Sequence, residues 1–206
     1  MELELSQLPA LERYKLLIGL VIPRPIAWVS TFSENGVANC APFSFFNVIS
    51  EDPPLCIISF NWRSDGEVKH TLKNIRRSGE FVVNLADEGT ANAMHLTGTE
   101  IPEAESEFSR FGLTPAPAKL VKHPRIAEAA ASLECRLERR INFGPEREMV
   151  VGEILLIHAR DGIIDPVTKR ISEELYHPVG RLFANRYSTT RQRFDLPGAL
   201  PPRKAP

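Results

Sequence analysis

The chain has 206 residues, of which 43% are hydrophobic, and this fits one medium-sized globular domain or at most two small ones. Its 25 Lys and Arg balance 26 Asp and Glu, so a net charge of −1 leaves no excess positive charge for a nucleic-acid partner. The longest apolar run, Leu16–Ile22, is far shorter than the roughly 20 residues of a membrane span. Met1–Ala10 lacks the basic start and apolar core of a signal peptide. We therefore expect a cytoplasmic protein without a membrane partner.

The first half of the chain is typical of β-strands. Pro25–Thr31 mixes β-branched and aromatic side chains, and Asn35-Gly36 is a strong hairpin signal, so Val37–Pro42 is expected to return beside it. After a turn at Asp52-Pro53-Pro54, the almost continuous apolar run Leu55–Phe60 predicts a strand that is buried on both faces.

A helix is expected next. Ser64–Gly66 offers capping side chains, and the spacing of Val68, Leu72 and Ile75 is helical up to Gly79, which ends the segment.

Five further segments complete the predicted elements. Glu80–Leu85 is a strand, and it is followed by an excursion in which Asp87–Thr97 and Glu103–Phe111 form short helices between proline-rich loops. Leu133–Phe143 and Glu148–Ala159 then return as long paired strands.

Hairpin turns separate six or seven strands, and few connections could hold a crossover helix. This pattern favours an antiparallel barrel over a parallel sheet. We expect a mainly β fold, a β-barrel with peripheral helices, as a single domain over residues 1–190. The proline-rich segment 191–206 is expected to be an extended tail, which another subunit could bind.

Several common kinds of active site are absent from the sequence. It contains no G-x-G-x-x-G, no Gly-Lys pair of a phosphate loop and no G-x-S-x-G. Cys40, Cys56 and Cys135 include no C-x-x-C pair and the five histidines have no metal-ligand spacing, so we expect buried free thiols and no metal site. No catalytic side chain is evident, and a bound cofactor could carry the chemistry.

One ordered series of segments carries the strongest signal. It comprises Arg24–Thr31, Asn35-Gly36, Asn39, Ala41–Phe46, Asp52–Pro54, Ser59-Phe60, Lys69–Thr71, Glu80–Leu85, Val151–Ile154 and His177–Leu182. In order and spacing, the series resembles the flavin reductase-like, FMN-binding split-barrel family over residues 12 to 188. The resemblance implies a six-stranded antiparallel split barrel that forms a homodimer, with FMN in a cleft between the subunits.

The residue types support this resemblance at the candidate site. Ser30, Thr31, Asn39 and Ser44 could bond the flavin or simply hydrogen-bond along the strands, and small residues such as Ala41 would let backbone amides approach the ring. Lys69, His70 and Thr71 at a helix start could bind the phosphate or form an ordinary helix surface. The candidate cofactor-binding residues are Arg24, Ser30, Thr31, Asn39, Ala41, Pro42, Ser44, Phe45, Ser59, Lys69, His70 and Thr71, and His177 and Arg181 are weaker substrate-binding candidates.

Two positions depart from the pattern of the family. His70 stands in the middle of the common Lys-Asp-Thr, and Arg147 stands where many short flavin reductases have histidine. Trp28, Phe46 and Phe60 could contact the flavin, as Phe45 could, but aromatic residues in strands are more often core.

The resemblance implies hydride transfer from NADH or NADPH to flavin N5, with the electrons passing to a second acceptor or a partner oxygenase. One alternative is an FMN electron carrier, flavoredoxin-like, that a redox protein partner reduces. Another is a split barrel that binds a ligand without redox chemistry.

Overall fold

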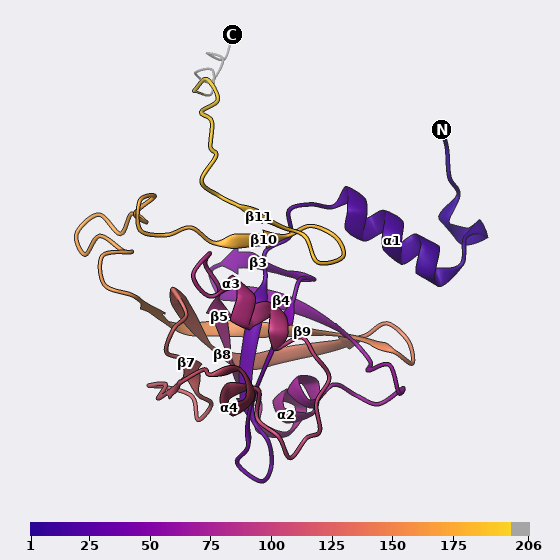
Figure 1. Ribbon diagram of the computed structural model, residues 1–206, viewed down its shortest axis with the longest axis horizontal. Coiled ribbons are helices and arrows are strands. Elements are labelled where there is room, and N and C mark those ends of the chain that lie inside the picture. The colour runs from indigo at the N-terminus through magenta and orange to yellow at the C-terminus, as the bar shows by residue number, and fades with distance from the viewer. Residues whose placement is uncertain (199–206) are drawn as a thin grey trace.

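A folded antiparallel sheet forms the body of the protein in the computed structural model, which describes residues 1–198 (Figure 1). The sheet has seven strands in the order β2-β1-β5-β8-β9-β4-β3. These strands are β1 (Ala27–Phe32), β2 (Ala38–Phe43), β3 (Phe46–Glu51), β4 (Pro54–Asn61), β5 (Glu80–Leu85), β8 (Ala131–Asn142) and β9 (Arg147–Ala159). All of its neighbouring strands are antiparallel.

The sheet closes into a barrel because its two edge strands are joined by a very short connection. Only Ser44 and Phe45 separate β2 at one edge from β3 at the other. The Ser59 N–H of β4 also donates to the Phe45 carbonyl at 2.8 Å. We call the place where the two edges meet the seam. The expected mainly β barrel is confirmed; its sheet has seven strands, where the resemblance implied six.

The barrel interior is filled by alternate side chains from facing strands. Ile58 and Phe60 of β4, Phe81 of β5 and Val150 of β9 are all fully buried. Gly152 of β9 leaves room for the Phe81 ring, since a Cβ at this position would lie 2.4 Å from Phe81 Cζ. The glycine is therefore required by close packing across the interior.

The strand β4 differs from the expectation that both of its faces are buried. Cys56, Ile58 and Phe60 point into the core, whereas Leu55 and Ile57 are only partly buried. The prediction from the continuous apolar run was wrong in this respect. Side chains alternate between the two faces of a strand, and in the described chain only the inner face of β4 is fully covered. All three cysteines are buried and free, as expected.

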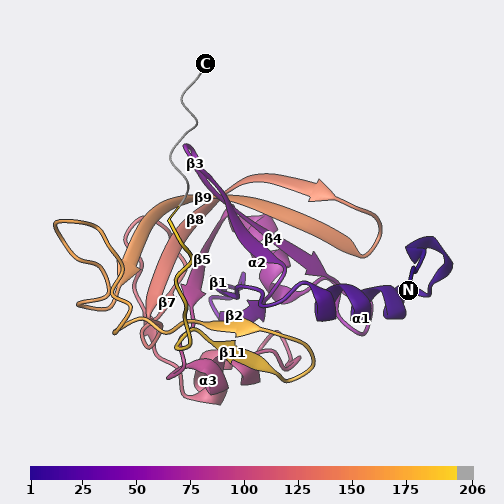
Figure 2. The same cartoon turned by 90° about the horizontal axis from the view of Figure 1, so that it is seen from above.

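Helices lie around the barrel (Figures 1 and 2). The helix α2 (His70–Ser78) packs against β1, β2 and β5 through Thr71, Leu72, Asn74 and Ile75. It ends at Gly79, whose positive φ of 71° suits a residue without Cβ. The helices α3 (Ala91–Leu96) and α4 (Glu107–Phe111) lie in the predicted excursion, together with the short pair β6 (Pro115–Ala116) and β7 (Arg125–Ile126).

A helix that the sequence analysis did not predict projects from the barrel. The 3-10 turn η1 (Leu5–Gln7) precedes α1 (Ala10–Leu20), which stands away from the sheet in both views (Figures 1 and 2). None of the residues of α1 is buried. Within residues 1–198 no helix is long and apolar enough to cross a membrane.

The C-terminal part returns to the start of the barrel. The hairpin of β10 (Val179–Arg181) and β11 (Tyr187–Thr189) pairs with the segment before β1 through the bridge between Arg24 and Arg181. Of the expected tail, residues 191–198 contain no helix or strand, and residues 199–206 lie outside the described part of the chain.

Candidate functional site

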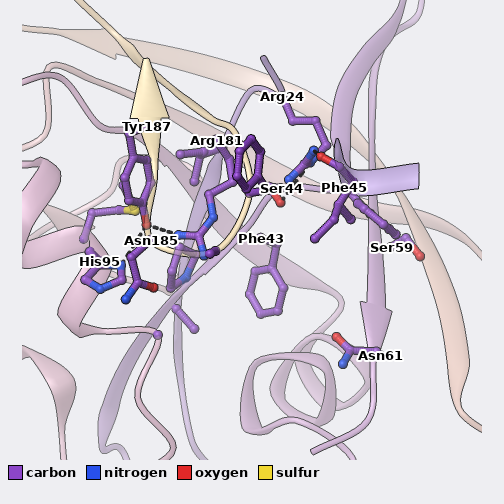
Figure 3. A pocket seen from close by; sticks show the side chains of 18 of the residues that line it. Arg24, Phe43, Ser44, Phe45, Ser59, Asn61, His95, Arg181, Asn185 and Tyr187 are labelled. Atoms are coloured by element: carbon purple, nitrogen blue, oxygen red, sulfur yellow. Dashed lines mark hydrogen bonds between the residues drawn. The ribbon is translucent and has the colours of Figure 1, made fainter. Parts of the chain in front are cut away.

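A cavity of about 570 Å³ opens beside the seam (Figure 3). Its lining comes from β2, β4 and the connection between β2 and β3, from α1 and α3, from the start of α2 and from the β10–β11 hairpin. This volume lies within the range of about 300–1,000 Å³ that is usual for small-molecule sites. Barrel closure therefore brings residues from both ends of the chain to one site.

The charge of the cavity lining has one sign. Arg24, Lys69, Arg147 and Arg181 contribute to it, and no Asp or Glu is among the lining residues of the described chain. Within residues 1–198, neither Arg147 nor Arg181 takes part in an ion pair. Because the whole chain has a net charge of −1, this concentration of cations is local, and it favours an anionic ligand.

One end of the cavity lies at the start of α2. Lys69 is the N-cap residue of that helix, whose first turn contains no acidic residue and has no side-chain cap. The first backbone N–H groups of a helix have no partner within it and attract negative charge. Lys69 Nζ lies 3.4 Å from Glu100 Oε1, and Ser59 and Asn61 of β4 add polar groups to the lining.

The other end of the cavity contains a chain of hydrogen bonds (Figure 3). Arg181 Nη1 donates to the Tyr187 hydroxyl, which lies 2.9 Å from His95 Nδ1. The Arg181 guanidinium also lies over the Tyr187 ring, 4.7 Å from its centroid. Asn185 lies on the same side of the cavity.

Arg24 joins three parts of the cavity wall. Its guanidinium donates to the Ile18 and Val21 carbonyls at 2.6 and 2.7 Å and to the Leu182 carbonyl at 2.5 Å. It also lies 3.4 Å from Ser44 Oγ. Burial lowers the pKa of Arg24 below its usual value. Most of its donors are therefore occupied in holding α1, the seam and the C-terminal hairpin together.

The comparison with known proteins decides the family. Residues 19–176 match the family described as the flavin reductase like domain. The chain belongs to the flavin reductase-like family. It is 45% identical to an uncharacterized protein of Aquifex aeolicus over 84% of this chain and 88% of that protein.

Two solved structures have the same fold as this flavin reductase-like chain. It is 37% identical to 2-nitrobenzoate 2-nitroreductase of Pseudomonas fluorescens, with a TM-score of 0.89 and 98% of each chain covered. It is 33% identical to nitrilotriacetate monooxygenase component B of Bacillus cereus, with a TM-score of 0.89 and coverage of 95% of this chain and 98% of that chain.

The cavity fits the flavin cofactor that membership of this family supports. Phe43, Phe45 and Phe183 offer apolar surface for a planar ring, whereas serine and asparagine side chains offer hydrogen bonds. The helix start with Lys69 offers the positive environment that a phosphate needs. The residues present thus match a molecule with a flat ring, a polar chain and a dianionic end.

Most of the predicted site residues are brought together in this cavity. Arg24, Ala41, Pro42, Ser44, Phe45, Ser59, Lys69 and Arg181 all line it. Of the four aromatic residues considered, only Phe45 lines the cavity, with the Arg147 guanidinium 5.6 Å from its ring centroid. Trp28, Phe46 and Phe60 are buried in the core.

Four predicted residues are instead hydrogen-bonded inside the protein, with Thr31, Asn39 and Thr71 in one buried network and Ser30 in another. Asn39 Oδ1 accepts hydrogen bonds from Thr71 and Thr31 at 2.8 and 3.3 Å, and Asn39 Nδ2 donates to the Glu107 carboxylate at 3.0 Å. Burial raises the pKa of Glu107. Ser30 Oγ donates to the Pro124 carbonyl at 2.5 Å and accepts from Asn84.

For Ser30, Thr31, Asn39 and Thr71 the structure shows hydrogen bonds within the protein in place of a position in the cavity wall. None of the four lines the cavity, because their polar atoms are hydrogen-bonded inside the protein. In the sequence, these polar side chains are cofactor-binding candidates because they lie beside a predicted hairpin or at a predicted helix start. The sequence does not show which face of the sheet the excursion covers.

Both histidines among the candidates also lie outside the cavity. His70 lies in a neighbouring hollow, where its Nε2 is 3.2 Å from Arg63 Nη1, and burial together with Arg63 lowers its pKa. The His177 carbonyl accepts a hydrogen bond from the Glu88 N–H, on the side of the β5–α3 connection. Along the chain, His177 is only four residues from Arg181. His177 precedes β10 and lines a separate hollow with Arg191, whereas Arg181 is the last residue of β10 and lines the cavity.

Sequence reasoning missed several residues of the cavity. Tyr14 and Ile18 come from the unpredicted α1, and His95, Asn185 and Tyr187 come from segments of no evident motif. Arg147, which in the sequence is only a departure from the pattern of the family, also lines the cavity. No spacing in the sequence could have connected these residues, because the barrel closure and the C-terminal hairpin bring them together.

Proposed function

We propose that this protein is an FMN-binding oxidoreductase, an NAD(P)H:flavin reductase that passes electrons to a second acceptor or a partner oxygenase. The observation that carries this proposal is the cavity at the seam, which combines an aromatic surface, a helix N-terminus with Lys69, and cations without an acidic residue in the described lining. The names of the two neighbours, a nitroreductase and a monooxygenase component, support both kinds of acceptor.

The residues at the start of α2 would hold the phosphate. Lys69 supplies a cation and the first turn supplies free N–H groups, whereas Ser59, Asn61 and Ser44 would bond the polar chain and the ring edge. Ala41 and Pro42 are small or compact residues of β2, so the ring could approach the backbone there.

The buried network would act indirectly. Thr71 and Asn74 of α2 are hydrogen-bonded to Asn39 of β2 and Thr31 of β1 at 2.8 and 3.0 Å. These bonds fix α2 relative to the barrel and so position Lys69. We therefore assign Thr31, Asn39 and Thr71 a positioning role rather than direct contact with the cofactor.

When bound, FMN supplies the redox chemistry by accepting a hydride from a reduced nicotinamide and giving up electrons. The protein would contribute binding and electrostatics. Arg147 beside Phe45 and Arg181 across the cavity favour negative charge inside it, because neither cation is neutralised by an acidic residue among residues 1–198. No acid-base side chain is required for this step.

We further propose that the protein works as a homodimer. The exposed apolar residues of α1 include Leu11, Leu17 and Leu20, at 62%, 47% and 78% exposure. A second copy would cover this surface, which also borders the cavity through Tyr14 and Ile18.

The deciding experiment is the visible absorption spectrum of the purified protein, followed by anaerobic addition of NADH or NADPH. We expect the bands of oxidised flavin and their bleaching by one nucleotide. A yellow protein that a nucleotide does not bleach would favour the electron carrier that a redox protein reduces. A colourless protein that does not bind added FMN would contradict the proposal and leave a ligand-binding barrel.

A further inference from the structure

The chain Arg181–Tyr187–His95 lies at the end of the cavity opposite the start of α2. Figure 3 shows Arg181, Tyr187, His95 and Asn185 on one side, Ser59 and Asn61 on the other, and Phe43 between them. The proposed phosphate position uses the end near Ser59 and Asn61. That position leaves the Arg181 end of the cavity without a contact to the phosphate.

This end offers hydrogen-bond donors in excess of acceptors. The Tyr187 hydroxyl accepts from Arg181 and can donate its own hydrogen to His95 Nδ1, which leaves His95 Nε2–H as a donor. Arg181 has five N–H donors, and one is used by Tyr187. The Asn185 amide adds further donors.

An unpaired guanidinium with adjacent donors is the arrangement that binds a planar anion. Within residues 1–198 no Asp or Glu lines this cavity, so the site lacks an internal anion for Arg181. Arginine recognises carboxylates through two parallel N–H···O bonds. The aromatic rings of Phe43, Phe183 and Tyr187 line the same cavity and provide flat apolar surface beside the donors.

We propose that Arg181, Tyr187 and His95 form a carboxylate subsite, so that the second ligand of this cavity is an aromatic carboxylate. Arg181 would bind the carboxylate, Tyr187 would hold the guanidinium in place, and His95 would fix the Tyr187 hydroxyl. The proposal deepens the proposed function and rests on it, since the carboxylate would hold the ring of the second ligand beside the flavin bound in the same cavity.

Position along the hairpin supplies a matched control. Arg186 lies one residue before Tyr187 on the same hairpin, is exposed and does not line the cavity. Its guanidinium lies 5.4 Å from the Phe183 ring centroid. Arg181→Met and Arg186→Met therefore remove the same charge from the same hairpin, but only the first removes it from the cavity.

The test is calorimetric titration of the FMN-loaded protein with benzoate, with benzamide as the uncharged probe. We expect benzoate to bind more tightly than benzamide, Arg181→Met to weaken benzoate at least tenfold, and Tyr187→Phe to weaken it several-fold. Arg186→Met should bind benzoate as the wild type does. The FMN dissociation constant should stay within about twofold in Tyr187→Phe and Arg186→Met. In Arg181→Met, which removes one cation from the cavity, it should rise by a smaller factor than the benzoate dissociation constant does.

Three results would overturn the carboxylate subsite. These are equal binding of benzoate and benzamide, benzoate affinity that is unchanged by Arg181→Met, or loss of FMN from Arg181→Met, which would assign Arg181 to the cofactor phosphate. Because Tyr187→Phe keeps the ring, it tests the subsite even if Arg181→Met does not fold. A protein that binds benzoate in this way but is not reduced by NADH or NADPH would contradict only the reductase proposal.

Discussion

Lys69, His70 and Thr71 are consecutive, yet their side chains face three different surroundings. Lys69 lines the cavity, His70 lies in a neighbouring hollow against Arg63, and Thr71 is buried against Asn39. A helix start rotates successive side chains by about 100°, so adjacent residues cannot all face one ligand. The motif lies at the helix start but does not identify which side chain reaches the site. The capping side chains expected at Ser64–Gly66 do not cap the helix, which begins at His70 without a side-chain cap.

The role of Lys69 can be tested against a lysine on the same helix. We expect Lys69→Gln to raise the FMN dissociation constant about tenfold, because a charge-assisted contact to the phosphate is lost. Lys73→Gln is the control, since Lys73 pairs with Glu103 at 2.9 Å and lies outside the cavity. Quenching of FMN fluorescence measures both constants. Equal affinities in the two variants would contradict the assignment of Lys69.

His123 predicts a pH dependence of stability. Its Nδ1 accepts from the Phe32 N–H and its Nε2 lies 2.8 Å from Ser78 Oγ, and burial lowers its pKa from 6.5 to about 4. Between these two pH values the imidazole of the unfolded chain is therefore protonated, whereas that of the folded protein is neutral. The free energy of unfolding should fall as the pH falls from about 6.5 to about 4, by on the order of 3 kcal/mol.

An NMR titration of the histidine Cε1–H resonances checks this directly. One resonance should titrate near pH 4 and be absent from His123→Gln. The variant should also show a shallower loss of stability over the same pH range in urea unfolding. A midpoint near 6.5 for the assigned His123 resonance would contradict the prediction.

At the scale of elements, short connections decide the arrangement more than strand propensity does. Only Ser44 and Phe45 separate the strands at the two edges of the sheet, so the sheet has to close there and the cavity lies at the join. The strand Glu80–Leu85 was predicted with its observed bounds, because its apolar, β-branched composition and the turn at Gly79 before it both indicate a strand that begins there. The strand β3 was missed because apolar and polar residues do not alternate regularly along Phe46–Glu51, where Val48 and Ile49 are adjacent.

Gly152 gives a prediction about packing between elements. An alanine Cβ would lie 2.4 Å from Phe81 Cζ, and the ring cannot move far within the core. We expect Gly152→Ala to lower the free energy of unfolding by about 1–3 kcal/mol, measured by urea unfolding.

A second glycine and a double variant complete this test. Gly19 of α1 has no atom within 4 Å of an added Cβ, so Gly19→Ala should not destabilise the protein. Combining Gly152→Ala with Phe81→Leu should cost less than the sum of the single changes, because the two residues share one space. Strict additivity would rule out the contact as the cause.

At the scale of the whole molecule, packing within one chain does not account for α1, which has no buried residue. It stands away from the barrel, and Arg24 holds its last turn through the Ile18 and Val21 carbonyls. Its apolar side chains are exposed in the described chain. A surface of this kind is typical of an interface with another molecule.

The proposed homodimer can be tested through two leucines of this helix. Wild-type protein should sediment as a dimer, and replacing Leu17 and Leu20 together by glutamate should give a monomer, because two charges would be placed in the proposed interface. Glu12→Gln, on the same helix, is expected to remain dimeric. A monomeric wild type would contradict the homodimer, and a dimeric leucine variant would exclude α1 from its interface.

The sequence by itself determined the family, the mainly β class and most strand positions, because alternation, turn residues and helix caps are local signals. It also identified eight of the cavity residues, among them Ala41, Pro42, Ser44 and Phe45 beside the seam. Only the tertiary structure decided which face each polar residue takes, since Asn39 and Thr71 are turned inwards by Glu107 and by each other. The Arg181–Tyr187–His95 chain likewise depends on contacts between segments far apart in the sequence, which no local pattern records.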